Sequence, residues 1–446
     1  MMLGAEAFDR IAARVLKRSP ADQTEVVVLG TDSALTRFAN SAIHQNVAEW
    51  NAVVRVRAIV GKRSGVAASN DLSDDALDRL AERAAEIARR QPEDTDLPDL
   101  PAPSELVPVD AYREETASCP PERRARMVAT ICRLATEQGL DASGALTTEL
   151  DVVGVANSRG LRRYEERTRA SLLTVVLDDA GSGYAERTSP SVDDLDAEAV
   201  GREAVDKAVR SRGAIRVEPG EYAVVLEEYA VGDLLNYLAY MGFGALALSE
   251  GTSFLRGKLG QRIVDERISV WDDGHDPHTL PASFDYEGVA KQRVALIERG
   301  VAAGVVYDSR TAAREGRAST GHALPAPSTF GPFPTNLVMA PGDTPKAELA
   351  RPIERGLWVT RLHYVNVVKS ERAALTGLTR DGTFLIEHGE VTRPIRNLRF
   401  TESVLAAWNA LGAISRERLL VEAWGGGTLA PAMRLDRFTF TGVSDA

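Results

Sequence analysis

A proline-rich acidic stretch at residues 92–112 restricts the folds open to this chain more than any other feature of its sequence. Pro98, Pro101 and Pro103 alternate there with acidic residues such as Asp96 and Asp99. Because proline fixes φ and has no backbone N–H to donate, the stretch cannot hold a helix and is typical of a linker. We therefore expect a boundary here, and a length of 446 residues indicates about three domains in all.

The apolar pattern predicts an α+β unit on each side of this linker. In residues 1–91 two helical patterns enclose short strands, of which Glu25–Leu29 and Ala34–Ser41 come first. Residues 113–214 begin with a helix after Pro120 and continue as a β meander, in which Asn157 to Gly160 suit a tight turn. We expect the sheets of these N-terminal units to be mixed or antiparallel.

The remainder, residues 215–446, is predicted to be a large β-rich domain. A strand from Tyr222 to Leu226 and a helix from Val231 to Leu248 are followed by many short strand-like runs separated by Gly, Pro and Asp. The predicted fold class is therefore α+β, with N-terminal α/β units and a β-rich C-terminal domain.

Charge and cysteine content exclude several classes of protein. The 53 basic and 64 acidic residues give a net charge of -11, which opposes binding to a phosphate backbone, so no nucleic acid partner is expected. The N-terminus lacks the features of a signal peptide, and no apolar run approaches the length of a membrane span. Cys119 and Cys132 form neither a disulfide framework nor a zinc-ligand pair. We expect a cytoplasmic protein with no membrane contact.

Two loop segments carry residues suited to a site. One contains Phe284, Asp285 and Gly288, and the other contains Ser319, Thr320, Gly321 and His322. They would line a binding site, or they would only hold their loops through hydrogen bonds from side chains to the backbone. Asp272 to His278 is a weaker metal candidate, since Gly274 and Pro277 make it a turn that does not aim two imidazoles at one ion.

The order of these and other segments resembles the TldD/PmbA family, specifically its PmbA (TldE) branch. The segments that carry the resemblance span most of the chain: Arg55 to Asn70, Gly251 to Leu255, Phe284 to Val289, Ser319 to Ala323, Thr376 to Gly382, and Phe384 to Glu390.

In that family the TldD subunit resembles a zinc peptidase with a His-Glu-x-x-x-His helix and a later Cys ligand. The resemblance places the three helix positions on Asn236, Tyr237 and Met241, and the later glycine-rich segment at Trp424 to Thr428 holds no Cys. An amide, a phenol and a thioether are poor ligands for a hydrolytic zinc ion, and none replaces the carboxylate base. The resemblance thus implies no metal site and no catalytic residue in this chain.

The implied function is that of a non-catalytic subunit in a TldD/TldE-type zinc metalloprotease complex that degrades or processes unfolded peptides. Zinc is expected in the TldD-type partner, and the chain would form a heterodimer with that partner or self-associate. Phe284 to Gly288 and Ser319 to His322 would then lie near the peptide chamber or the subunit contact. Two alternatives remain open: an independent metal-dependent hydrolase that uses His275, His278, Asp285 and His322, and a purely regulatory binding protein.

Overall fold

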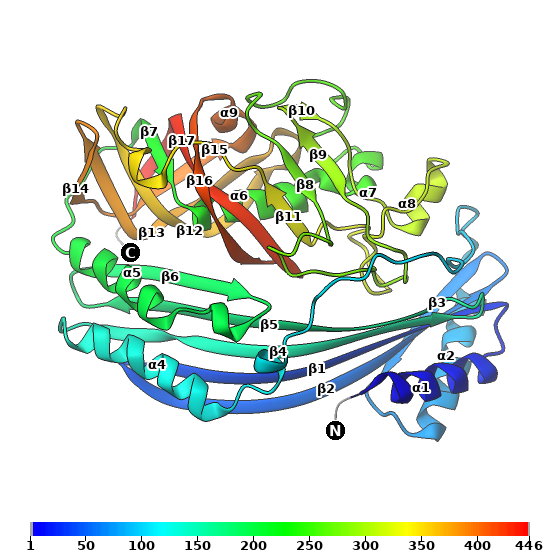
Figure 1. Ribbon diagram of the computed structural model, residues 1–446. Coiled ribbons are helices and arrows are strands. Elements are labelled where there is room, and N and C mark those ends of the chain that lie inside the picture. The colour runs from blue at the N-terminus through cyan, green and yellow to red at the C-terminus, as the bar shows by residue number, and fades with distance from the viewer. Residues whose placement is uncertain (1–2, 445–446) are drawn as a thin grey trace.

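The computed structural model describes residues 3–444 and consists of two layers (Figure 1). The N-terminal half forms a six-stranded antiparallel sheet in the order β3-β2-β1-β4-β5-β6. The C-terminal half forms an eleven-stranded mixed sheet with its own helices, and it lies over the face of the first sheet that α1, α2 and α4 leave open. The predicted α+β class with a β-rich C-terminal domain is confirmed.

The first sheet contains unusually long strands and is covered by helices at both of its ends. Its strands are β1 (Gln23–Ala39), β2 (Ala42–Val60), β3 (Arg63–Ser69), β4 (Asp141–Asn157), β5 (Arg162–Leu177) and β6 (Ser182–Ser189). Its helices are α1 (Ala5–Arg18), α2 (Asp74–Arg90), the short α3 (Glu114–Ala117), α4 (Pro121–Thr136) and α5 (Ala197–Arg210).

The segments on either side of the linker share this one sheet. Strand β1 pairs with β4 from Glu25 opposite Asn157 to Phe38 opposite Gly144. The two short strands expected at Glu25–Leu29 and Ala34–Ser41 are a single strand, because the intervening Gly-Thr-Asp-Ser residues continue the pairing instead of turning. Thr31 Oγ1 donates to Asp151 Oδ1 on β4 at 2.7 Å, which gives the polar middle of the strand a partner.

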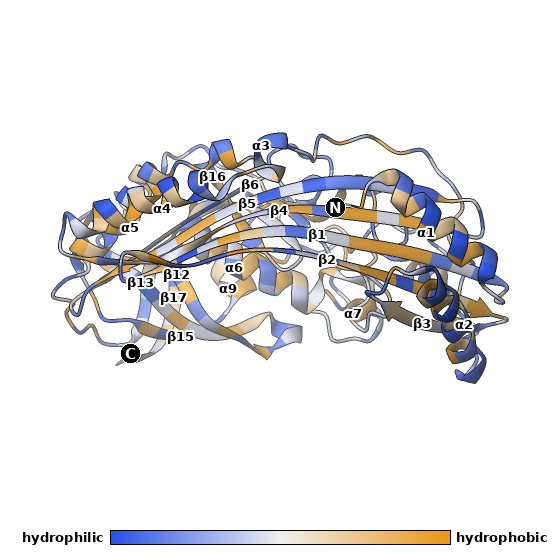
Figure 2. Ribbon diagram, turned by 90° about the horizontal axis from the view of Figure 1, so that it is seen from below, coloured by the Kyte–Doolittle hydropathy of each residue, from blue (hydrophilic) through white to orange (hydrophobic). Residues whose placement is uncertain are grey.

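Two hydrophobic cores hold the helices to this sheet. One joins α1 and α2 to the strands and includes Phe8 and Leu80, and the other lies beneath α4 and α5 and includes Phe38 and Ile131. Figure 2 shows apolar stretches of the strands next to these helices. The strand predicted to end at Ser41 ends at Ala39, because Asn40 and Ser41 take positive φ and form the turn between β1 and β2.

The C-terminal half is built around the long strand β17. Its strands are β7 (Gly220–Leu226), β8 (Val270–Asp272), β9 (Val294–Glu298), β10 (Val301–Ala302), β11 (Asn336–Met339), β12 (Arg355–Lys369), β13 (Ala374–Glu387), β14 (Glu390–Pro394), β15 (Leu398–Ser403), β16 (Leu411–Ala423) and β17 (Gly426–Val443). Its helices are α6 (Glu228–Leu238), α7 (Ala245–Ser249), α8 (Ser309–Arg314) and α9 (Val404–Asn409).

The predicted helix at Val231–Leu248 is interrupted. Helix α6 ends at Leu238, a π turn covers Ala239–Phe243, and α7 follows. Gly242 lies in the π turn, where an added Cβ would meet the Phe254 ring at 2.6 Å, so the glycine allows close packing. Because π turns are frequent at functional sites, this interruption makes the helix a candidate part of such a site. Within residues 3–444 no helix is long and apolar enough to cross a membrane.

Candidate functional site

The helix α6 and the hairpin between β16 and β17 meet at one pocket. Asn236 on α6 is buried, and its Oδ1 accepts a hydrogen bond from Thr428 Oγ1 of β17 at 3.2 Å. Trp424 occupies the hairpin turn and lies beside the same helix. The two segments that the family resemblance singles out are therefore neighbours in space, although Asn236 and Thr428 are 192 residues apart in the chain.

Tyr237 and Trp424 line this pocket, which has a volume of ≈ 470 Å³, and an aromatic wall continues from them to Tyr240 and Phe330 outside the lining. Tyr237 and Tyr240 both meet Trp424 edge to face, with ring centroids at 5.1 and 5.5 Å, and Tyr240 also meets Phe330 at 5.9 Å. Trp424, Tyr240 and Phe330 are about half exposed, at 48%, 46% and 60%. Clustered exposed aromatic rings are typical of surfaces that bind another molecule.

A carboxyl group with a perturbed pKa lies in the same pocket. Asp233 is one helical turn before Tyr237 and is half-buried in the pocket lining. Burial, with a contribution from nearby Glu186, raises its pKa to about 7, and Arg361 offsets this only in part. Glu422, also in the lining, forms an ion pair with Arg169 of β5 at 3.1 Å. The pocket thus combines an aromatic wall with a proton-exchanging carboxyl group near neutral pH.

The residues at the expected ligand positions do not fit a zinc ion. Asn236 is engaged by Thr428, the Tyr237 hydroxyl donates to the Val365 carbonyl oxygen, and Met241 is 2% exposed within the hydrophobic core. Over residues 3–444 the structure contains no group of three His, Cys, Asp or Glu side chains placed to hold a metal. These three residues therefore cannot supply the ligands that a hydrolytic zinc ion needs.

The segment with Phe284, Asp285 and Gly288 lies between the two halves of the molecule. The Phe284 ring packs in a core cluster with Val27 of β1 and Val153 of β4, and Gly288 lies against Leu161. Asp285 is 5% exposed, and its carboxylate accepts from the backbone N–H groups of Glu287, Val289 and Ala323 at 2.8 to 2.9 Å. Burial and the neighbouring Glu287 raise the pKa of Asp285.

The segment with Ser319, Thr320, Gly321 and His322 packs directly behind it. His322 is 1% exposed, and its Nε2 lies 2.8 Å from Asp272 Oδ1 while its Nδ1 lies 2.9 Å from Thr320 Oγ1. Burial opposes ionisation of Asp272, but Lys291 and His322 outweigh it and lower the pKa of Asp272 to about 2. Ser319 donates to the Tyr307 carbonyl oxygen, and Gly321 takes a positive φ of 75° in this turn.

These contacts bring the two predicted segments together through the Ala323 N–H and Asp285, in a buried part of the molecule. The alternative metal set is not assembled. His275 lies near Asp273, His278 contacts Asp276, and His322 contacts Asp272, so each imidazole has a separate carboxylate.

A second cleft, of ≈ 260 Å³, opens on the other side of the β16–β17 turn, between that turn and the long sheet. Gly425 and Gly426 form one wall, Tyr286 lines it from the segment after Phe284, and Arg167 and Asp151 line it from the sheet. Burial raises the pKa of Asp151. The hairpin turn thus has a cleft on each side.

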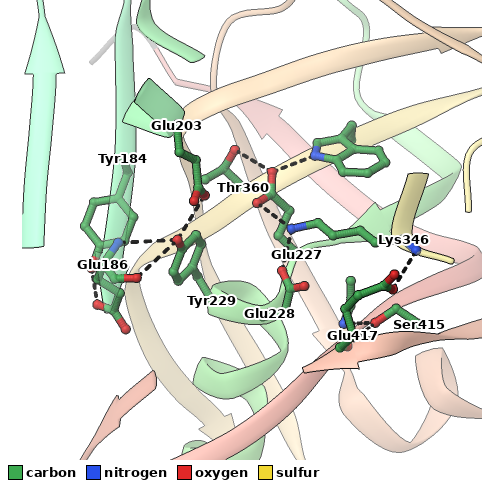
Figure 3. A network of polar contacts seen from close by, with 12 residues as sticks. Tyr184, Glu186, Glu203, Glu227, Glu228, Tyr229, Lys346, Thr360, Ser415 and Glu417 are labelled. Carbon is green, nitrogen blue, oxygen red and sulfur yellow. Dashed lines mark hydrogen bonds and ion pairs between the residues drawn. The ribbon is translucent and has the colours of Figure 1, made fainter. Parts of the chain in front are cut away.

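A buried ionic network that no sequence motif marks joins the two halves (Figure 3). Glu227, 2% exposed at the start of α6, accepts from Lys207 Nζ at 2.9 Å and from Trp358 Nε1 at 2.7 Å, and Lys346 Nζ lies at 3.3 Å. Burial opposes its ionisation, but the two lysines outweigh this and hold the pKa of Glu227 well below its ordinary value. A buried charge of this kind has no periodic signature, so only the fold reveals it.

Three comparisons with known proteins agree with this architecture, which is that of a metallopeptidase-like α+β protein. Models of the PmbA/TldA metallopeptidase family match residues 24–88 (domain 1), 123–212 (central domain) and 219–442 (C-terminal domain). The chain therefore belongs to the TldD/PmbA family, as the sequence resemblance predicts. Several relatives are named metalloproteases, and one is named a zinc metalloprotease.

Individual relatives are distant. The chain is 33% identical to an uncharacterised protein of Methanocaldococcus jannaschii over 41% of this chain and 43% of that protein. It is 24% identical to the metalloprotease PmbA of Escherichia coli O157:H7 over 94% of this chain and 93% of that one. The crystal structure of TldE from Thermococcus kodakarensis has the same fold, with a TM-score of 0.88 and 21% identity over 97% of this chain and 99% of that one. The PmbA match supports the PmbA (TldE) branch, and the TldE structure shows the shared fold.

The first two curated relatives are matched over only 43% and 56% of their own lengths. The matches therefore do not assign the activities of those whole proteins to this chain.

Proposed function

We propose that this chain is a non-catalytic PmbA/TldE-type subunit that pairs with a TldD-type zinc metallopeptidase and helps to hold unfolded peptides for cleavage. One observation carries the proposal. The helix and hairpin to which the resemblance assigns the metal ligands meet in space, and the meeting point holds Asn236, Tyr237, Thr428 and Trp424, which are poor zinc ligands. The chain thus has the helix and hairpin of a peptidase site, but these residues provide neither zinc ligands nor a catalytic base.

The aromatic wall supports a role in peptide binding. Rings such as Trp424 and Tyr240 offer apolar contact without demanding a particular sequence, which suits unfolded peptides. The cleft beside Gly425 and Gly426 is lined by strand residues of the long sheet, where an extended peptide would find polar partners in Arg167 and Asp151. A cytoplasmic location forms part of the proposal, since both cysteines are free and buried.

The test is a reconstituted cleavage assay on an unfolded peptide, with this chain, a TldD-type subunit, or both. We expect cleavage and one zinc per complex only when the TldD-type subunit is present, and faster cleavage when both are present. Trp424→Ala should slow cleavage by the complex about tenfold while leaving association unchanged, because it removes exposed aromatic contact at the pocket. Val107→Ala, at an apolar residue that is 59% exposed on the linker, is the matched control.

Chelator-sensitive cleavage by this chain alone, with stoichiometric zinc, would overturn the proposal. The same assay also separates it from a purely regulatory role, in which neither association with a TldD-type subunit nor an effect on cleavage would be seen.

A further inference from the structure

The pocket beside α6 carries an excess of negative charge. Asp233 and Glu422 lie in its lining, and Glu186 of β6 reaches the same place, since its Oε1 accepts from the Glu422 backbone N–H at 3.4 Å. Among residues 3–444 no Lys, Arg or His forms an ion pair with Asp233. Burial raises the pKa of this carboxyl group, and the more distant charge of Arg361 offsets the effect only in part. Asp233 thus lacks a direct cationic partner.

Two nearby arginines do not neutralise the pocket, because each is already held by a carboxylate outside it. Arg169 pairs with Glu422 at 3.1 Å, but it also pairs with Glu149 of β4. Arg361 pairs with Asp381 on the neighbouring strand β13. An added cation in this pocket would therefore meet carboxylates that the chain leaves only partly compensated.

Aromatic rings surround this negative charge. Tyr237, Tyr364 and Trp424 all line the pocket. The Tyr237 hydroxyl donates to the Val365 carbonyl oxygen, and the Tyr237 ring meets Trp424 edge to face, so both rings are held in place. His363, also in the lining, adds no charge near neutral pH, because burial and the neighbouring arginines lower its pKa. Aromatic rings beside a carboxylate form a favourable environment for an ammonium or guanidinium group.

We infer that this pocket binds a lysine or arginine side chain of an extended peptide, with the cationic group at Asp233 beside the rings of Tyr237 and Trp424. Tyr364 is 74% exposed and Trp424 is 48% exposed, so a side chain can enter from solvent while the peptide backbone stays outside. The volume of ≈ 470 Å³ accommodates one such side chain. The inference rests on the proposed function, because it names the class of peptide that the proposed peptide-binding subunit would hold.

The experiment measures binding of unstructured peptides to the purified full chain, by fluorescence anisotropy of a label at the peptide C-terminus. Two peptides with an acetylated N-terminus differ at one position, which is lysine or its neutral analogue norleucine. We expect the lysine peptide to bind at least about tenfold more tightly, by a margin that falls as salt is raised. A norleucine peptide with a free N-terminus tests the other source of an ammonium group, and binding as tight as that of the lysine peptide would overturn the side-chain assignment.

Variants of the chain locate the effect. Asp233→Asn keeps the size of the side chain and removes its charge, so it should abolish the preference for lysine while the norleucine peptide binds as before. Trp424→Ala should weaken binding of the lysine peptide several-fold, because one ring beside the cation is lost. Glu218→Gln is the matched control and should keep the preference, since the Glu218 side chain is 82% exposed and lies outside the pocket lining. Circular dichroism checks that each variant is folded.

Equal affinity of the natural chain for the lysine and norleucine peptides, or binding of neither, would overturn the inference. A preference for lysine that survives in Asp233→Asn would also overturn it. This assay uses the chain alone, whereas the proposed function is tested by cleavage in the presence of a TldD-type subunit. A complex that cleaves peptides without any preference for lysine would therefore contradict only the inference, and lysine binding without cleavage by the complex would contradict only the proposed function.

Discussion

Replacing Glu227 with glutamine tests how the two halves of the molecule are held together. The change removes a negative charge that is 2% exposed and lies between Lys207 and Lys346. Each lysine keeps one carboxylate, Glu203 at 2.8 Å for Lys207 and Glu228 at 2.6 Å for Lys346, so the network is weakened without being abolished. Loss of one partner from a buried ion pair costs about 3–5 kcal/mol, and the surviving contacts place the expected loss at about 3 kcal/mol.

The pH dependence provides a second signature of the same substitution. The folded-state pKa of Glu227 lies well below its ordinary value, so its ionised form stabilises the fold above an unfolded-state pKa of about 4.3. That contribution is lost as the pH falls from there toward the folded-state pKa. The difference in unfolding free energy between the natural chain and Glu227→Gln should therefore be full at pH 7 and shrink below about pH 4.

Urea unfolding followed by tryptophan fluorescence is the assay, and Trp358, one of five tryptophans, donates directly to Glu227. Glu218→Gln is the matched control, because the side chain of Glu218 is 82% exposed and should change stability by less than about 0.5 kcal/mol. A Glu227→Gln protein as stable as the natural chain at pH 7 would refute the argument that this network joins the two halves.

Three further predictions concern other groups. Asp233→Asn should stabilise the fold by at least about 1 kcal/mol at pH 8 but not at pH 3, because a raised folded-state pKa penalises the ionised carboxylate. The free energy of unfolding, measured by denaturation at both pH values, checks this, and an equal change at both would contradict it. Asp285→Ala should cost about 2–4 kcal/mol, since three buried N–H groups lose their acceptor, and calorimetry showing no loss would be the contrary result. In a thiol titration at pH 8, Cys119 and Cys132 should react slowly until the chain unfolds, because burial raises both pKa values, and rapid native reaction would count against their burial.

The sequence alone predicts the family and much of the order of helices and strands. The turn at Asn157 to Gly160, the helix after Pro120 and the β-rich C-terminal half follow local chemistry, since turn residues, proline and apolar spacing act within a few residues. The identity of the residues at the expected ligand positions, Asn236, Tyr237 and Met241, is likewise fixed by the chain alone.

Tertiary structure decided what depends on distant partners. The polar residues between Leu29 and Ala34 continue β1 only because β4 supplies Asp151 for Thr31, a contact that no local pattern contains. In the same way, the aromatic wall exists because the hairpin turn carries Trp424 onto α6. Pairing between strands and burial of charge are set by residues far apart in the chain, so their energies appear only once the layers have packed.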